Sequence, residues 1–494
     1  MILVLYILVL AALVVHAPLE LFTPEARAFL VIAGVIGAWR YGWQLLHLVR
    51  SLVYRGLVFP RLRRRAEACA AAAPTPELFI VVTSYRIPAE TTASVFRAAI
   101  AEAAGLGRPV TLVAAVGEAA DQRFVKAIFQ TAAAPPEVRL ALVRLPPRGK
   151  RPALAAALRA VARLRPHPEA AVMVMDGDAV LPEGSLLRCL PLLQATPRTG
   201  AITTDQDAVV AGGRLQTAWH RLRFAQRHVV MSSLSLSRRL LVITGRMAVY
   251  RAAVATDPRF IARIENDALD HWRLGRVPFL TGEDKSSWSW LLEQGHDMIY
   301  VPDVRVTTIE HPPAPGFAAS STRLMLRWFG NMLRAGGRAI ALGPARVGLF
   351  PWLCLVDQRV SMWTTLVGPV AAVLIALVWS PVFLYAYLVW VMATRLVQTL
   401  VLLTARPRIS GLWPVLLYYT QIWGALVKTW VLFRPDHQRW TRQDITLAGR
   451  GGGRAAALGS AVLHGLALTG LATAVALAVG ALSWPVGLVH TGLF

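Results

Sequence analysis

The stretch that decides the fold is AAVMVMDGD, residues 170–178. An uninterrupted apolar run leads into Asp176, and Gly177 separates that aspartate from Asp178. A short apolar run that ends at a turn signal is typical of a strand buried in a parallel sheet. Ligands of such sheets bind where the carboxyl ends of the strands open, so we expect both carboxylates at that edge.

The chain before this strand alternates between two kinds of pattern. Short runs of aliphatic and β-branched residues, typical of strands, are separated by longer alanine-rich or amphipathic stretches, typical of helices. That rhythm indicates an α/β domain with a mostly parallel sheet. The expected strands are 78–83, 110–116, 139–145 and 170–175, and the expected helices are 92–104 and 152–164.

The composition places this domain in a membrane protein. Of the 494 residues, 55% are hydrophobic and only 16% are charged, which is too apolar for a soluble enzyme of this length. A further apolar segment, 411–433, contains Pro414 and Lys428 and is expected to be broken or interfacial. We therefore expect five spans, or six if that segment crosses. The five, each long enough for a bilayer, are 2–21, 29–52, 360–378, 382–403 and 455–484.

The flanking charges predict the orientation. The second apolar stretch is followed by Arg61 and by Arg63 to Arg65, which the positive-inside rule places in the cytoplasm. The first stretch lacks the basic start of a secretory signal, so we expect it to be retained as a helix. The expected domains are a transmembrane helix pair at 1–66, a cytosolic α/β domain at 67–320, interfacial amphipathic helices at 321–359, and a C-terminal transmembrane region at 360–494 with a loop near 436–446.

The excess of basic residues raises two questions, one about the partners of the chain and one about cations inside the apolar segments. A net charge of +24 raises nucleic acid as a partner, but no basic-aromatic recognition module is present, so we expect none. Arg40, Arg395 and Lys428 fall inside apolar segments, where a cation costs about 3 kcal/mol unless it has a partner or faces a cavity. Two interpretations stay open: these side chains reach the interface, or they line a wet channel that attracts an anionic chain.

Two acidic motifs could carry chemistry. Asp176 and Asp178 could hold a divalent ion, Mg²⁺ or Mn²⁺, that also takes the two phosphates of a nucleotide sugar. The alternative is an ordinary Asp-Gly turn. The stretch TGED, residues 281–284, supplies Asp284, which could deprotonate an attacking hydroxyl. A helix-capping aspartate is the alternative there.

A third motif is LMLRW, residues 324–328. The Trp328 ring would suit the apolar face of a pyranose, and the Arg327 guanidinium could hold a diphosphate as charge leaves the sugar. An Arg-Trp pair at a membrane surface is also typical of an interface anchor.

In this order the motifs resemble those of the processive family 2 glycosyltransferases of membranes, which include cellulose, hyaluronan and chitin synthases. That family has a donor-binding strand turn, a D-x-D, a T-E-D-like triplet, Q-x-x-R-W and a gating loop. The order is more specific than any single motif. Leu324 replaces the family's glutamine, and in this respect the chain is similar to the mannuronan synthases. The matching segments here are 83–86, 176–178, 282–284, 324–328 and 440–442, supported by 39–41, 222–228 and 357–359.

The resemblance implies a GT-A-like domain at a bacterial inner membrane, with GDP-mannuronate as donor and β-1,4-linked polymannuronate as product, formed with inversion and moved across the bilayer. It implies a metal on Asp178, helped by Asp176, with Asp284 as base, Arg327 at the diphosphate and Trp328 under the acceptor. A separate cyclic di-GMP-binding co-polymerase is the implied partner. A related synthase that uses a UDP-sugar, or a non-catalytic transporter, is the alternative.

Further residues are assigned to substrate binding. A bidentate guanidinium suits a planar carboxylate, so Arg246, with Arg273 and Arg276, could read a uronate, although surface salt bridges would explain them equally well. His311 could line the acceptor path or belong to a structural turn. Lys150 and Arg151 could reach the nucleotide. The other residues assigned to substrate binding are Thr83, Tyr85, Glu90, Asp176 and Glu283, and Trp440, Thr441 and Arg442 in the gating loop.

Overall fold

The computed structural model describes residues 1–482 except 23, 147, 280 and 438–452. These residues form two compact units, which are described separately. The sheet unit comprises His47–Val356 and the segment that begins at Pro435. The helical unit comprises Met1–Leu46, Asp357–Arg434 and the C-terminal helix. The compact units therefore divide at 46/47 and 356/357, whereas the sequence placed domain boundaries at 66 and 359.

The first half of the sheet is the parallel part predicted from the apolar runs. The strand order of the whole sheet is β3-β2-β1-β4-β7-β6-β10-β5. The pairs β2–β3, β1–β2 and β1–β4 are parallel, which confirms the expected arrangement. Their bounds are β1 Leu78–Ser84, β2 Val110–Val116, β3 Val138–Arg144 and β4 Ala171–Asp176.

The second half of the sheet was not predicted. Strand β7 runs antiparallel to both β4 and β6, and β6 pairs in parallel with β10. Buried polar residues such as Thr203, Asp205 and Gln206 interrupt β6, so it lacks the apolar run that marks β1 to β4. The bounds are β5 Ala179–Val180, β6 Thr199–Val210, β7 Ala248–Arg251 and β10 Asp297–Glu310.

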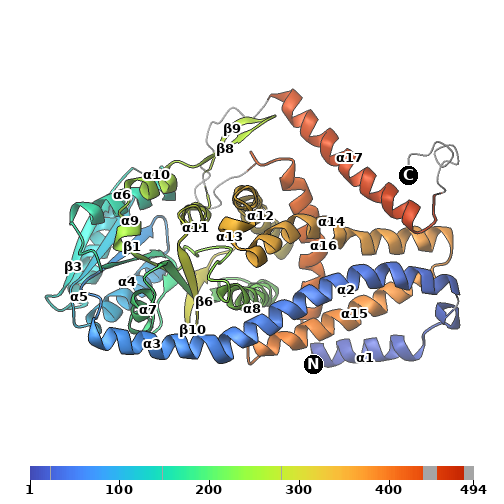
Figure 1. Ribbon diagram of the computed structural model, residues 1–494, viewed down its shortest axis with the longest axis horizontal. Helices are drawn as coiled ribbons and strands as arrows, with labels where there is room; N and C mark the ends of the chain where they lie inside the picture. Colours follow the sequence, from blue (N-terminus) through green and yellow to red (C-terminus); the bar gives the residue numbers. More distant parts are fainter. Residues whose placement is uncertain (23, 147, 280, 438–452, 483–494) are drawn as a thin grey trace. The chain divides into compact units, whose positions relative to one another are not determined.

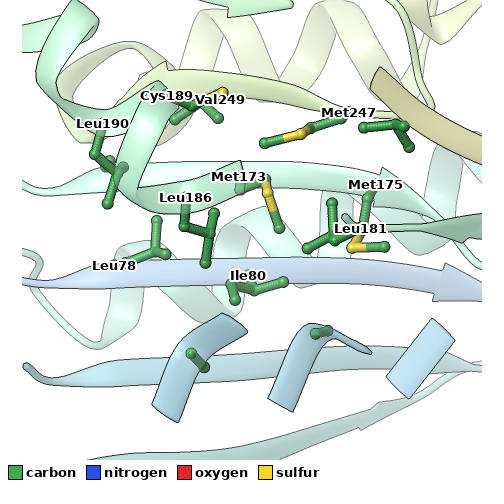
Figure 2. Packing of buried hydrophobic residues seen from close by; sticks show 14 of the residues in the cluster. Leu78, Ile80, Met173, Met175, Leu181, Leu186, Cys189, Leu190, Met247 and Val249 are labelled. Carbon is green, nitrogen blue, oxygen red and sulfur yellow. The ribbon is translucent and has the colours of Figure 1, made fainter. Parts of the chain in front are cut away.

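Strand β1 in the middle of the parallel part is buried on both faces because helices cover the sheet (Figure 1). Alternate residues of β1, Leu78 and Ile80 among them, pack with Met173 of β4 and Leu186 of α7 in one apolar core (Figure 2). The expected helices at 92–104 and 152–164 are confirmed as α4 and α6, each starting slightly earlier. The main covering helices are α4 Ala89–Ala104, α5 Ala119–Thr131, α6 Lys150–Arg163, α7 Ser185–Gln194, α8 Arg214–Ser235, α11 Glu283–Glu293 and α12 Phe317–Ala341.

Smaller elements complete the sheet unit. A separate two-stranded antiparallel sheet is formed by β8 and β9. A π-helical turn, η2, interrupts the helix that enters this unit from the N-terminal side. The bounds are η2 Tyr54–Val58, α3 Phe59–Ala72, α9 Ala252–Ala255, α10 Pro258–Glu265, β8 Ala268–His271, β9 Gly275–Pro278 and α13 Gly343–Val347.

The helical unit contains three described helices that are long and apolar enough to cross a membrane. They are Leu349–Val378 (α14), whose N-terminal part lies in the sheet unit, Val382–Thr404 (α15 Val382–Val401 with η3 Leu402–Thr404) and Arg454–Ala478 (α17). They correspond to the last three of the five predicted spans. The other helices are α1 Ile2–Val15, η1 Leu19–Phe22, α2 Pro24–Val53, which continues into the sheet unit, and α16 Trp413–Leu432.

Two details of the predicted membrane segments need correction. The helix in the first segment, α1, has 14 residues, fewer than the roughly 20 that cross a bilayer. The segment with Pro414 is an unbroken helix, because Pro414 lies in its first turn, where no intrahelical hydrogen bond is lost. The prediction of a break there is wrong. The span expected at 29–52 lies within α2, and its crossing stays a prediction.

The cations inside the apolar segments have polar partners in the helical unit. Arg40 forms an ion pair with Asp357 at 2.9 Å, and Lys428 also interacts electrostatically with this aspartate. Arg395 is only 5% exposed and donates a hydrogen bond to Gln398 at 2.6 Å. The channel role of Arg40, Arg395 and Lys428 stays a prediction.

We expect Ile80→Ala to destabilise the sheet unit by about 2–5 kcal/mol, because Ile80 is fully buried in β1 between β2 and β4. The control Ile80→Val removes one methyl group and should cost only about 0.5–1.5 kcal/mol. The midpoint of thermal unfolding of the detergent-purified protein measures both effects. Equal midpoints for the two variants would contradict this account of the core.

Candidate active site

The ends of β1 and β4 bring the first acidic motif together with Thr83. Thr83 lies opposite Asp176 in the parallel register, and the Gly177 N–H donates to the Thr83 carbonyl at 3.0 Å. A Cβ at residue 177 would lie 2.8 Å from that carbonyl oxygen, so only glycine fits this turn. The turn leaves Asp176 partly accessible and Asp178 buried at the carboxyl edge of the sheet.

Lys150 joins the two acidic motifs. It is the first residue of α6, and its Nζ forms ion pairs with Asp176 and with Glu283. Burial works against the charged amine, but Asp176 and Glu283 together raise the pKa of Lys150. Burial likewise opposes ionisation of Glu283, but Lys150 and Arg151 lower its pKa overall. At neutral pH Lys150 is therefore a fixed cation between two carboxylates.

Arg151 lies in the interior behind this group. The residue is 3% exposed, and its guanidinium donates to the carbonyls of Ile264 at 2.7 Å and Thr281 at 3.0 Å, and to Ser286 Oγ at 2.9 Å. These bonds hold the turn that leads into Glu283. Arg151 thus has interior hydrogen-bond partners, and its assignment to substrate binding stays a prediction.

Asp284 occupies the first turn of α11, directly after Glu283. The cap of that helix is Gly282, so Asp284 is not the capping residue. Burial, and then the neighbouring Glu283, raise the pKa of Asp284, although Lys285, Lys150 and Arg227 act in the opposite direction. A carboxylate whose pKa is raised toward neutral is a better proton acceptor. The environment of Asp284 therefore suits a general base.

Arg327 and Trp328 lie on α12. The Trp328 ring stacks on the fully buried Trp219 of α8, with centroids 5.7 Å apart and planes 18° from parallel. Arg327 acts electrostatically on Glu310 at the end of β10. Trp328 is therefore part of an aromatic cluster of the sheet unit, and its role as a simple interface anchor is not supported.

Arg246 lies close to the first acidic motif. It forms an ion pair with Glu310 at 2.5 Å and donates to Gln206 Oε1 at 3.2 Å. Burial lowers the pKa of Arg246, but Glu310, with smaller contributions from Asp178 and Asp176, raises it overall. Glu310 and Gln206 were missed because they lie on β10 and β6, the strands that the apolar pattern did not reveal.

The remaining assigned residues are more scattered. Tyr85 is half-buried and its ring lies 5.2 Å from the Arg86 guanidinium carbon, while Glu90 and His311 are exposed. Arg273 and Arg276 lie on or beside the separate β8–β9 hairpin. The gating-loop residues Trp440, Thr441 and Arg442 lie outside the described residues. The segment before them is anchored on α12, where Arg334 donates to the Pro435 carbonyl at 3.2 Å.

The carboxylates of Asp176 and Asp178 fit a divalent ion that is also coordinated by a bound ligand. In the part of the chain that the structure describes, no group of three or more His, Cys, Asp or Glu side chains is arranged to hold a metal. Asp176 and Asp178 offer two carboxylates at one edge of the sheet. Hard divalent ions bound to one or two carboxylates commonly complete their coordination with water and phosphate oxygens. The residues present therefore fit a metal that arrives with a diphosphate.

Comparisons with known proteins agree with this geometry. The model of the glycosyltransferase-like family 2 matches residues 75–331, which contain both acidic motifs and Arg327–Trp328. The chain is 44% identical over 443 residues to glycosyltransferase alg8 of Pseudomonas syringae pv. tomato, covering 90% of each chain. It is also 44% identical over 444 residues to glycosyltransferase alg8 of Azotobacter vinelandii, again covering 90% of each chain.

Among solved structures, the chain is similar to the mannosyltransferase PcManGT from Pyrobaculum calidifontis in complex with GDP-Man and Mn²⁺. The identity is 17% and the TM-score 0.45, with 79% of this chain and 98% of that chain covered.

We expect Gly282→Ala to disrupt the first turn of α11. Gly282 has φ +84, and a Cβ there would lie 2.7 Å from Asn331 Cγ, so both backbone strain and crowding oppose the change. Such strain costs on the order of 1–3 kcal/mol. Hydrogen exchange of the amides in 283–288 should become faster.

A matched control for this change is Gly184→Ala. Gly184 has φ +74 at the start of α7, but no atom lies within 4 Å of an added Cβ. Exchange in α11 should be unchanged in this variant. Equally slow exchange of α11 in Gly282→Ala and in the unmodified protein would contradict the packing described for Gly282.

Proposed function

This chain belongs to glycosyltransferase family 2 and, within it, to the Alg8 glycosyltransferases, the alginate polymerase catalytic subunits, and from that premise we propose that it polymerises mannuronic acid from GDP-mannuronate into β-1,4-linked polymannuronate. Its sheet unit has the GT-A-like fold. The observation that carries the proposal is the single electrostatic cluster at the strand ends, in which Lys150 connects Asp176 to Glu283, next to Asp284.

The donor occupies the carboxyl edge of the sheet in this proposal. Asp178, helped by Asp176, would hold the divalent ion, and that ion supplies charge neutralisation for the diphosphate when bound. Thr83 and Tyr85 lie at the end of β1, beside this edge. Lys150 adds a fixed positive charge between the two acidic motifs. These groups hold the donor with its diphosphate at the strand ends.

The reaction is a single in-line displacement. Asp284 takes the proton of the acceptor 4-hydroxyl while that oxygen forms its bond to the anomeric carbon of the donor. The bond from that carbon to the diphosphate breaks, GDP leaves with the electron pair, and the configuration inverts. Arg327 stabilises the charge on the departing diphosphate, and Trp328 supports the acceptor sugar.

We also propose where the enzyme lies, how its site closes and what regulates it. The three helices long enough to cross a membrane support a synthase in the bacterial inner membrane, with the sheet unit in the cytoplasm and the polymer moved through the helical unit. The loop that follows Pro435 would close over the donor and exclude water. A cyclic di-GMP-binding co-polymerase subunit would regulate the reaction.

We expect membranes that contain this chain and its co-polymerase partner to release GDP from GDP-mannuronate and to form polyuronate. UDP-glucose and UDP-glucuronate, offered separately, should not be used. Asp284→Asn should lower the rate by about 10²–10⁴, because a neutral amide cannot accept the proton.

The control for this experiment is Asp121→Asn on α5, the same chemical change on a helix that does not enter the strand-end cluster. It should leave GDP release unchanged. The proposal is wrong if a UDP-sugar is the better donor, or if Asp284→Asn releases GDP as fast as the unmodified chain.

The pH dependence of the rate should reflect the protonation of Asp284. The base must be ionised to act, so activity falls as the pH drops through the pKa of Asp284, which burial raises. The charge on Lys285 favours the ionised form of Asp284. Lys285→Gln removes that charge, raises the pKa further and should move the acidic limb of the GDP-release profile to higher pH.

Lys126→Gln on α5 is the matched control for this charge change, and its profile should overlay that of the unmodified chain. An acidic limb that stays in place in Lys285→Gln, or moves to lower pH, would show that Asp284 does not govern it.

A further inference from the structure

Arg223 of α8 lies against the aromatic cluster that includes Trp328. Its guanidinium carbon is 4.3 Å from the centroid of the Trp328 ring and 5.1 Å from that of Trp219. Among the described residues it forms no ion pair with a carboxylate, and its guanidinium lies over the rings of Trp219, Trp328 and Phe329. It also remains partly accessible. A positive charge is thus held over the ring of Trp328, the proposed support of the acceptor sugar.

Arg227 lies one helical turn further along the same face of α8. It donates to Gln206 Oε1 at 3.1 Å, and the same oxygen also accepts a hydrogen bond from Arg246. Within the described part of the chain Arg227 has no carboxylate partner either, but it acts electrostatically on Asp284. The guanidinium groups of α8 therefore extend from Trp328 toward the proposed base.

The three arginines Arg223, Arg227 and Arg246 carry more positive charge than is balanced by the carboxylate paired with them. Arg223, Arg227 and Arg246 lie close enough to influence one another, and of the three only Arg246 is ion-paired within the described residues, with Glu310. Burial, and then repulsion from Arg227 and Arg246, lower the pKa of Arg223 to about 9. Burial and Arg246 likewise lower the pKa of Arg227 to about 10. An anion bound between these side chains would relieve this repulsion.

We propose that Arg223 and Arg227 bind the carboxylate of the acceptor uronate that rests on Trp328, so that the acceptor side of the site selects a polyanion. This inference rests on the proposed function, because it concerns the acceptor of the same reaction. It adds two recognition residues on α8 that were not among the sequence-based assignments.

The position of the two arginines favours a sugar carboxylate over the donor diphosphate. The diphosphate belongs with Asp176, Asp178 and Lys150 at the ends of β1 and β4, whereas Arg223 contacts the rings of Trp328 and Trp219. A sugar that rests against Trp328 would place a carboxylate at its rim within reach of the guanidinium that lies over that ring. A planar guanidinium suits a planar carboxylate, and an aromatic face suits the apolar side of a sugar.

The test measures acceptor binding directly, without donor. Labelled trimannuronate and its carboxyl-reduced, neutral counterpart are titrated against the full-length protein in detergent by equilibrium dialysis. The unmodified chain should prefer the anionic trimer. Arg223→Gln and Arg227→Gln should each weaken binding of the anionic trimer by roughly 10- to 100-fold, the loss expected for a charge-assisted hydrogen bond, and leave binding of the neutral trimer nearly unchanged.

Two further variants make the outcome decisive. Arg223→Lys keeps the charge and should retain part of the preference for the anionic trimer. Arg221→Gln removes an exposed arginine from the same helix and should bind both trimers as the unmodified chain does. Unfolding midpoints identify any variant that has lost its fold, and for such a variant the lysine substitution at the same residue gives the result.

The inference is overturned if the ratio of anionic to neutral binding is the same in the unmodified chain and in Arg223→Gln and Arg227→Gln. Its failure is distinct from failure of the proposed function. If GDP-mannuronate is not a donor, GDP release is absent in the unmodified chain, but the selectivity of trimer binding is still measured and still decides the role of the arginines.

Discussion

The site depends on one largely enclosed ammonium group, that of Lys150. Lys150 forms ion pairs with both Asp176 and Glu283, two carboxylates that are far apart in the sequence. Without a cation between them, burial and mutual repulsion would favour protonation of one acid or separation of the two segments. The position of Asp284 follows, because it is the residue after Glu283 in the same helical turn. Gly245 also contributes, since a Cβ there would lie 3.1 Å from the Lys150 amine.

The sequence was sufficient for the parts of the fold that repeat a simple pattern. The strands β1 to β4 are apolar runs bounded by turns, so both their positions and their parallel pairing could be predicted. Strand β6 could not, because its buried Thr203, Asp205 and Gln206 are satisfied by tertiary hydrogen bonds that no local pattern records. The same reason applies to the interior hydrogen bonds of Arg151, which no local pattern records. A basic residue beside a turn is typical of a phosphate contact, and only the folded chain shows the carbonyls that occupy it.

The candidate site also contains residues that the sequence could indicate and residues that it could not. Asp176, Asp178 and Asp284 stand next to strand or helix ends, where sequence pattern and position agree. The guanidinium groups of α8 have no such signal, since an arginine on an amphipathic helix is most often solvated. Their importance comes from α8 packing against α12 so that Trp219 stacks on Trp328. The combination of acidic strand ends and a basic helix gives one site two regions of opposite charge. That division would keep a metal-bound diphosphate apart from an anionic chain end.

Two arginines of helix α12, Arg327 and Arg334, make separate contacts at a fixed spacing along the helix. Arg327 acts on Glu310, and Arg334, seven positions later, donates to the Pro435 carbonyl. Seven residues make nearly two turns, so both side chains project from the same side of the helix. One inserted residue between them would rotate Arg334 by about 100° relative to Arg327. Evolution of this enzyme can therefore change the identity of residues in that interval far more readily than their number.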